Sequence, residues 1–248
     1  FKAYFLKSAK ENSWTVAIYV SGWSPLYVQS NFLRSVALTL TYFESKNMLT
    51  PEERQLIINW GNEINLDQRA GDEGIKSNDS IAAMGAAKMA WGIASKQPEI
   101  FSSGYSAYVS ALPYILNNVG DASIESRHSG RMTNLEEYNL NVSHLVDGAA
   151  ILENAGLNGF ELKHDGKSIR DAVIYLASEV VKRPAKFSLF ALSSHGYHLG
   201  WVPIYLNFFK ESAEAVTLQQ LMGKLNFFPI EALNLGGPVQ CLWGYSAP

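Results

Sequence analysis

Four polar side chains recur along one predicted helix in the stretch SGRMTNLEEYNLNVSHLVDGAAIL at 129–152: Arg131, Asn134, Tyr138 and Asn141. Arg131 and Tyr138 are seven residues apart, which is two helical turns less about 20°, so they share a face about 10 Å apart along the axis. That gap is too long for a direct contact, but it suits a cation and a phenol that flank a bound sugar ring. The alternative is a solvated face from which Arg131 and Tyr138 extend into water.

Helical signals dominate the rest of the chain. Thr50 as N-cap, Pro51 at the first helical position and Glu53 as the capping-box partner predict the start of one helix. The stretch 77–96 is rich in Ala and Gly, which lets neighbouring helices approach closely. Apolar spacing predicts further helices at 24–46, at 98–120 with a bend at Pro113, from 129 to an αL stop at Ala155-Gly156, at 168–184 with a Ser cap, and within 196–209 and 217–228.

Strand patterns are scarce, and GFELKHDGKSI at 159–169 predicts at most a short hairpin. The sequence therefore predicts one all-α domain over residues 1–248, with eight or nine helices joined by short loops. Helices that pair off every 40–50 residues suit an (α/α) toroid of antiparallel pairs or an α-solenoid, whereas a four-helix bundle would leave helices over.

Composition excludes several classes of function. The net charge is −3, so no global basic field favours nucleic acid. No run of 18 or more apolar residues predicts a membrane span. Cys241 is the one cysteine, so no internal disulfide can form. The N-terminal stretch FKAYFLKSAKENSW lacks the pattern of a signal peptide, and no cofactor is expected.

A second cluster, SSHGYHLGW, holds His195, Tyr197, His198 and Trp201. The His-x-x-His spacing invites a metal, but no third ligand follows at a characteristic spacing and the glutamate of the zinc proteases is absent, so no metal site is predicted. These aromatic and imidazole groups are candidates for stacking on sugar or hydrogen bonding to it. The alternative for all four is plain packing.

Several pieces in order resemble the alginate lyase family of polysaccharide lyases, which fold as an incomplete (α/α) toroid. GRMTNLEEYNL looks like the family's segment of an Arg, six residues, and a Tyr followed by an x-Leu pair. The continuation LVDGAAILENAGLNGFELKHDGKSIRDAVIYLASEVVKRP is similar to the family's helix, stop, hairpin and next helix, and LGWVPIYLNFF to its late Trp-containing helix. KSNDS at 76–80 lies where the family has an Asn-Asn-His helix start. The resemblance spans roughly residues 25–210.

The resemblance implies a lyase that removes the C5 proton of a 4-O-linked uronate and expels the C4 oxygen. Arg131, a forked donor, and Asn78, an uncharged one, would neutralise the uronate carboxylate. Tyr138 would serve as acid, and as base too if proton and leaving group lie on one side of the ring. Its pKa is ordinarily about 10, and a nearby Arg131 is expected to favour the phenolate.

One position departs from the family. Asp79 stands where the family carries a His, and a carboxylate there would repel a uronate unless it turns away or is protonated. His128, just before the helix, is the candidate to replace that His as base or neutralising group; its alternative is an exposed loop histidine. His144 is expected to be structural, and His164 to be a turn residue.

Two other functions remain open. Toroid glycoside hydrolases use two carboxylates, and Asp79 with Glu125, Glu136 or Glu137 would supply such a pair. A non-catalytic polysaccharide-binding protein of lyase fold is the other alternative. The expected partner is an acidic polysaccharide, alginate or a related polyuronate, bound through the catalytic residues and through Asp79, Asn134, Asn141 and the His195–Trp201 cluster. The resemblance implies a periplasmic or secreted location.

Overall fold

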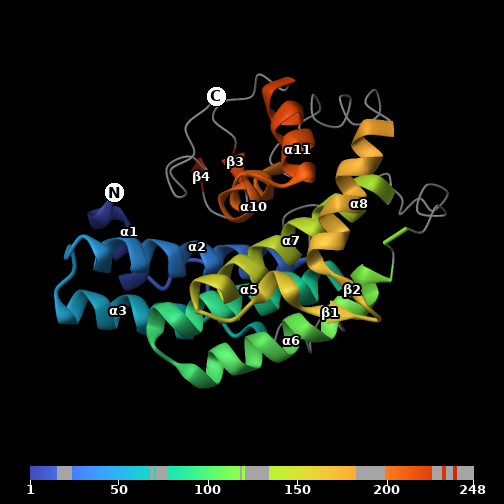
Figure 1. The fold of residues 1–248 in the computed structure, drawn as a ribbon. Helices are drawn as coiled ribbons and strands as arrows, with labels where there is room; N and C mark the ends of the chain where they lie inside the picture. The colour runs from blue at the N-terminus through green and yellow to red at the C-terminus, as the bar shows by residue number, and fades with distance from the viewer. Residues whose placement is uncertain are drawn as a thin grey trace. The chain divides into compact units, whose positions relative to one another are not determined.

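The computed structural model divides the chain into two compact units, an N-terminal unit of Phe1–Val109 and a C-terminal unit of Ser110–Pro248. In the residues that are described, each unit is built almost wholly of helices (Figure 1). The described residues are 1–15, 24–67, 70, 78–117, 119–120, 134–182, 199–224, 231–232 and 237–238. The single domain expected over residues 1–248 stays a prediction.

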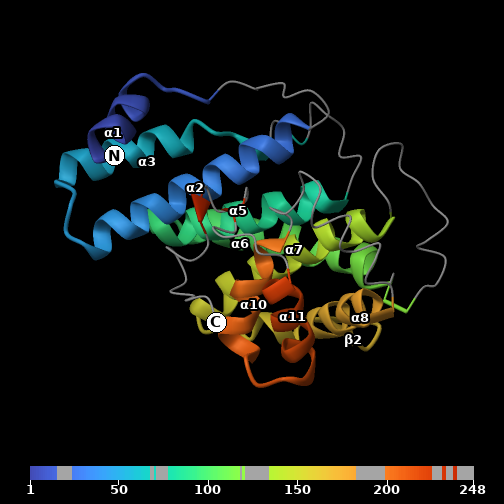
Figure 2. The same cartoon turned by 90° about the horizontal axis from the view of Figure 1, so that it is seen from above.

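The N-terminal unit packs its helices around a shared apolar core. Helix α2 lies along α5, and α1 packs on α3 (Figure 2). The core includes the fully buried Leu40, Phe43, Ile57 and Trp91. Its helices are α1 (Lys2–Lys10), α2 (Pro25–Ser45), α3 (Pro51–Asn62), α5 (Asn78–Ser95) and the first part of α6 (Pro98–Leu116).

Local chemistry fixes where these helices begin. The hydroxyl of Thr50 accepts from the backbone N–H of Glu53 at 3.2 Å, and the Glu53 carboxylate accepts from the backbone N–H of Thr50 at 2.9 Å. The capping box predicted at α3 is therefore confirmed. The Ser24 hydroxyl likewise accepts from the backbone N–H of Tyr27 at 3.3 Å at the start of α2, satisfying one of the donors that a helix start leaves unpaired.

Helices α5 and α6 approach each other at glycines. A β-carbon added at Gly104 of α6 would lie 2.6 Å from the backbone nitrogen of Met89, and one added at Gly85 of α5 would lie 2.6 Å from the backbone nitrogen of Tyr108. Backbone atoms cannot move aside as a flexible side-chain end can. The small residues of 77–96 thus allow the close approach that the sequence predicted.

The C-terminal unit is organised around α7 (Asn134–Asn154). Helices α8 and α10 and the short helix η2 pack on α7, and α11 packs on α8. Its other elements are η2 (Gly159–Glu161), β1 (Lys163–His164), β2 (Lys167–Ser168), α8 (Ile169–Lys182), α10 (Trp201–Phe209), α11 (Ala213–Lys224), β3 (Glu231–Ala232) and β4 (Gly237–Pro238).

Turn residues behave as the sequence predicted after α7. Gly156 takes a left-handed φ of 77°, and the backbone N–H of Leu157 reaches back to the carbonyl of Leu152 at 2.8 Å, which ends the helix. Asp165 and Gly166 have φ of 48° and 78°, as the two-residue turn of a hairpin requires. The predicted short hairpin is therefore confirmed as β1–β2, in which His164 pairs with Lys167.

One helix begins earlier than predicted. Apolar spacing placed the last helix at 217–228, whereas α11 begins at Ala213. The Ser212 hydroxyl accepts from the backbone N–H of Ala215 at 3.3 Å, so Ser212 caps the helix. The cap signal was present in the sequence but precedes the apolar periodicity by more than a turn.

Helix α7 is buried on every side along much of its length. All residues from 142 to 150 are buried, which a helix achieves only when neighbours cover it all round. Tyr138, near its start, is 2% exposed. The alternative of a solvated face is therefore wrong for Tyr138.

Replacing Gly104 by alanine tests the close contact of α5 and α6. The added methyl group would meet the backbone of Met89 and of Gly85, so we expect Gly104→Ala to lower the free energy of unfolding by about 1–3 kcal/mol, as overpacking does. Thermal unfolding measures it. Ser102→Ala, at an exposed position of the same helix, is the control and should change stability little; equal stability of the two variants would contradict the close contact.

Candidate active site

The phenol of Tyr138 is the central feature of the candidate site. Its ring packs edge-on against Tyr175 of α8, with centroids 5.6 Å apart at 81°. Its hydroxyl is buried, and among the residues that the structure describes it has no hydrogen-bond partner. A buried hydroxyl without a partner costs free energy, so its place on the central helix calls for a functional explanation.

Burial raises the pKa of Tyr138 well above its usual value, and the neighbouring Tyr175 raises it further. These surroundings favour the neutral phenol, because a phenolate would lose its hydration without gaining a countercharge. Sequence analysis had predicted that a nearby Arg131 would favour the phenolate and so lower the pKa of Tyr138. Arg131 lies outside the described residues, so the described surroundings alone favour a Tyr138 hydroxyl that keeps its proton.

The amides beside Tyr138 have different settings. Asn139 is fully buried, and its Oδ1 accepts from the indole N–H of Trp201 at 2.9 Å, which ties α7 to α10. Asn141, one of the predicted substrate contacts, is half-buried on α7. His144 is 0% exposed, consistent with the structural role expected for it.

Trp201 differs from its predicted role. It was expected to contact sugar, but its side chain is 1% exposed and its only polar group is engaged by Asn139. A ring buried to this extent has no free face on which a sugar can stack. The packing alternative therefore holds for Trp201, and we leave it out of the proposed site.

The remaining predicted residues fall into two groups. Asn78 and Asp79 are the first two residues of α5, where a helix start was predicted. Asn134 is the first residue of α7, although the predicted helix began at 129. The side chains of these three residues are not described. A carboxylate such as Asp79 at a helix start is favoured by the helix dipole. Outside the described residues lie Arg131, His128, His195, Tyr197 and His198.

A second buried tyrosine shows what a satisfied phenol looks like in this protein. Tyr205 of α10 donates to the Glu214 carboxylate at 2.6 Å, and Arg170 of α8 donates to the same oxygen at 2.9 Å. Burial raises the pKa of Glu214, but these two donors outweigh it and hold that pKa below its ordinary value. Sequence analysis missed this cluster, because its members come from three helices and share no local motif.

The described residues hold neither a cluster of metal ligands nor a helix suited to a membrane. No group of three or more His, Cys, Asp or Glu side chains within these ranges lies close enough together to hold a metal ion. No helix in the same ranges is both long enough and apolar enough to cross a membrane.

Comparison with known proteins relates this fold to one class of enzyme. No protein-family model and no curated protein matches the sequence. Among solved structures, alginate lyase A1-III from Sphingomonas species A1 matches with a TM-score of 0.70 at 18% identity, over 99% of this chain and 68% of that chain. Two variants of alginate lyase A1-III, one His-to-Ala and one Tyr-to-Phe, each complexed with a tetrasaccharide, also match with TM-scores of 0.70 at 18% identity, over 99% of this chain and 71% and 70% of theirs.

The chain therefore has the fold of an alginate lyase. The predicted class, an all-α incomplete (α/α) toroid, is confirmed by this likeness. At 18% identity the likeness establishes the fold and leaves the reaction and the substrate to be argued from the residues.

The two buried tyrosines should respond oppositely to loss of the hydroxyl. Tyr138→Phe removes a buried hydroxyl that lacks a partner in the described residues, so we expect the free energy of unfolding to stay unchanged or to rise by up to about 1–3 kcal/mol. Tyr205→Phe removes a hydrogen bond to a charged partner and should lower it by about 1.5–3 kcal/mol. Chemical denaturation measures both; a Tyr138→Phe protein as destabilised as Tyr205→Phe would show that Tyr138 is satisfied.

Proposed function

We propose that this protein is a polysaccharide lyase that cleaves a uronate-containing polysaccharide, alginate or a related polyuronate, by β-elimination. The observation that carries the proposal is the buried phenol of Tyr138, which is kept neutral and without a partner among the described residues on the central helix of an alginate lyase fold. Solved structures of that fold include complexes with a tetrasaccharide, which supports a polysaccharide as substrate.

The reaction needs a stabilised carboxylate before it needs a base. The C5 proton of a uronate is barely acidic while the neighbouring carboxylate keeps its charge, and its removal builds a second negative charge on that group. Preorganised donors lower the barrier by meeting this charge as it develops. In our proposal Arg131 meets the carboxylate with its forked donors, and Asn78 adds an uncharged one.

Proton transfer then completes the elimination. A base takes the C5 proton, the electron pair of that C–H bond forms the C4–C5 double bond, the bond from C4 to its glycosidic oxygen breaks, and the oxygen receives a proton. Tyr138 is proposed as the acid, because a phenol with a raised pKa holds its proton until the leaving oxygen becomes basic. His128 is proposed as the base; the alternative is that Tyr138 performs both transfers.

Neighbouring sugar units require further contacts. We propose that Asn134, Asn141, His195, Tyr197 and His198 hydrogen bond to them or stack on them. The substrate would then be an acidic polysaccharide outside the cytoplasm, in the periplasm or the medium. The support for these contacts is the sequence pattern, together with the position of Asn134 and Asn141 on the helix of Tyr138.

A glycoside hydrolase with a carboxylate pair, Asp79 with Glu125, Glu136 or Glu137, is the second candidate. Elimination creates a conjugated double bond that absorbs in the ultraviolet, whereas hydrolysis creates a reducing end without it. A panel of polyuronates therefore separates the two reactions in one assay. Binding with neither product would favour a non-catalytic polysaccharide-binding protein.

The sharpest kinetic prediction concerns Tyr138. Tyr138→Phe keeps the ring and removes the transferable proton, so we expect kcat to fall by about 10²–10⁴-fold or more while substrate binding is nearly unchanged. Ultraviolet absorbance of the unsaturated product on the best polyuronate measures it. Tyr205→Phe is the control: its folded fraction should have the kcat of the unmodified protein. A Tyr138→Phe protein with wild-type kcat would rule out the mechanism.

Arg131 should give a different kinetic signature. Arg131→Lys keeps the charge but loses the fork, and the carboxylate gains charge in the transition state. We therefore expect both weaker ground-state binding and a lower kcat, with kcat/KM falling more than kcat. A change in KM alone would assign Arg131 to uniform binding.

Asp79 tests whether the start of α5 contacts substrate. If it does, Asp79→His removes a repulsive carboxylate and should tighten binding of a uronate oligomer, measured by calorimetry. If Asp79 only stabilises the helix dipole, the same change should lower the melting temperature by the equivalent of about 0.3–1 kcal/mol and leave affinity unchanged. Asp79→Asn, which removes the charge and keeps the shape, separates charge from the new imidazole.

A further inference from the structure

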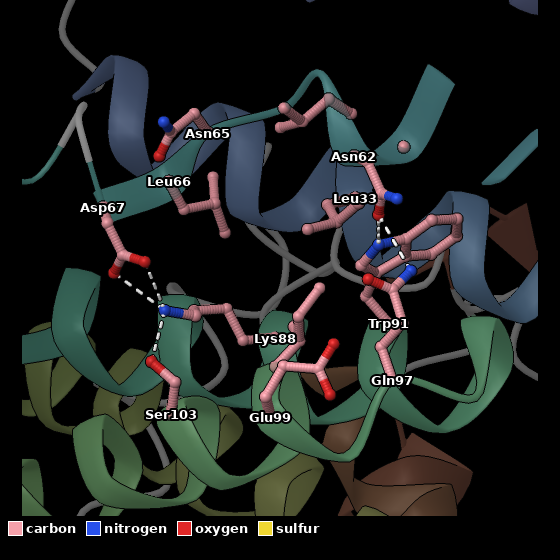
Figure 3. Close-up of a pocket in the computed structure, with 13 residues that line it drawn as sticks. Leu33, Asn62, Asn65, Leu66, Asp67, Lys88, Trp91, Gln97, Glu99 and Ser103 are labelled. Atoms are coloured by element: carbon pink, nitrogen blue, oxygen red, sulfur yellow. Dashed lines mark hydrogen bonds and ion pairs between the residues drawn. The ribbon is translucent and has the colours of Figure 1, made fainter. Parts of the chain in front are cut away.

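A pocket in the N-terminal unit has no role in the proposed reaction. It has a volume of about 430 Å³ and lies between the end of α3, the segment Ile64–Asp67, and helices α5 and α6. Figure 3 shows its polar lining. On α5 its residue Lys88 is ten positions beyond Asn78, about 15 Å along the helix axis, so the pocket is distinct from the helix start to which Asn78 belongs.

Lys88 is the one cation among the described residues that line the pocket, and it is fully engaged. The ammonium group of Lys88 donates to both carboxylate oxygens of Asp67 at 2.7 Å and to the hydroxyl of Ser103 at 2.6 Å (Figure 3). Lysine has three N–H donors, and these contacts use all of them. The Lys88 side chain is 8% exposed, so it is held in place and has no donor left for an anionic ligand.

Two amides of the pocket have orientations fixed by chemistry. The indole of Trp91 can only donate, and it donates to Asn62 Oδ1 at 2.9 Å. Gln97 must therefore present its NH₂ group to the same oxygen, which it does at 3.1 Å (Figure 3). These two hydrogen bonds leave the Asn62 NH₂ group and the Gln97 carbonyl oxygen without a hydrogen-bond partner within the described ranges.

The remaining charge is negative. Glu99, in the first turn of α6, lines the pocket and forms no hydrogen bond or ion pair within the part of the chain that is described. Since Asp67 and Lys88 neutralise each other, Glu99 gives the lining a net negative charge. This charge disfavours a carboxylate ligand, and the Asn62 NH₂ group, which can only donate, offers nothing to an ammonium ligand.

We propose that this pocket binds an uncharged sugar residue. A sugar hydroxyl both donates and accepts, which matches a lining that offers the Asn62 donor beside the acceptors of Gln97 and Glu99. The aliphatic side chains of Leu33, Leu66 and Ile100 provide an apolar wall for the C–H face of the ring. The volume falls in the range of small-molecule sites, and the site is independent of the proposed lyase reaction.

Nuclear magnetic resonance of the indole N–H of Trp91 offers a direct test, because that group touches the amide that would bind the ligand. Methyl glucoside, galactoside and mannoside are the probes. Methyl glucuronide, which replaces only the C6 hydroxymethyl of the glucoside by a carboxylate, is the matched ligand control. We expect a neutral glycoside to shift the Trp91 signal and to bind about twofold to fivefold more tightly than the glucuronide, as a single exposed charge allows.

Conservative variants identify the groups involved. Asn62→Asp keeps the oxygen that holds Trp91 and Gln97 but removes the donor, and Glu99→Ala removes an acceptor; each should weaken the neutral glycoside about twofold to tenfold. Glu99→Gln removes the negative charge and should reduce the difference in affinity between the glucoside and the glucuronide. Glu63 is an exposed glutamate next to Asn62 that does not line the pocket. Glu63→Gln should therefore change neither the affinity for the neutral glycoside nor the difference in affinity between glucoside and glucuronide.

Three results would overturn the proposal. They are the absence of a Trp91 shift with every neutral glycoside, tighter binding of the glucuronide than of the glucoside, or undiminished binding in both Asn62→Asp and Glu99→Ala. Tyr138→Phe should bind the neutral glycoside as the unmodified protein does. Failure of the lyase reaction would thus leave this site intact, and failure of this site would leave the lyase proposal intact.

Discussion

The burial of α7, which is complete from residue 142 to residue 150, is the constraint on which the C-terminal unit depends. A helix covered on all sides can carry polar side chains only where partners satisfy them, yet α7 places Tyr138, Asn139, Asn141 and His144 within a few turns. Asn139 meets this demand by accepting from the indole of Trp201. That bond ties α10 to α7. The Tyr138 hydroxyl has no hydrogen-bond partner among the described residues, and in this it differs from Asn139, the next residue of the helix.

The two buried tyrosines Tyr138 and Tyr205 differ in whether their hydroxyl groups are paired. Tyr205 is as buried as Tyr138, but it donates to Glu214, which Arg170 also holds, so three helices share one satisfied polar cluster. The cost of burying that phenol is offset by a charged hydrogen bond. Loss of stability at a functional site is a common compromise in proteins, and the proposed role of Tyr138 as an acid would account for the uncompensated hydroxyl.

Sequence reasoning succeeded where local chemistry decides. The capping box at Thr50, the left-handed stop at Gly156 and the hairpin turn each depend on residues within a few positions of one another. It failed where distant segments meet: Trp201 was assigned to sugar because its partner Asn139 is 62 positions away, and neither the Lys88–Asp67–Ser103 cluster nor the Glu214 cluster has a local signature. Spacing also placed Tyr138 on a shared polar face with Arg131, but spacing cannot show that neighbouring helices cover the other faces of the helix as well.

The setting of Tyr138 finally constrains the chemistry through two opposing effects. Burial disfavours the phenolate, while an approaching guanidinium, as proposed for Arg131, would favour it. A base must lose its proton before substrate binds, and burial works against that state. An acid needs only to keep its proton until the C4 oxygen becomes basic, and burial supports that state. In the proposed reaction the substrate carboxylate would neutralise Arg131, so the effect of burial on Tyr138 would prevail when the bond breaks. Binding of the substrate would therefore favour the neutral phenol of Tyr138, which is the form that acts as an acid.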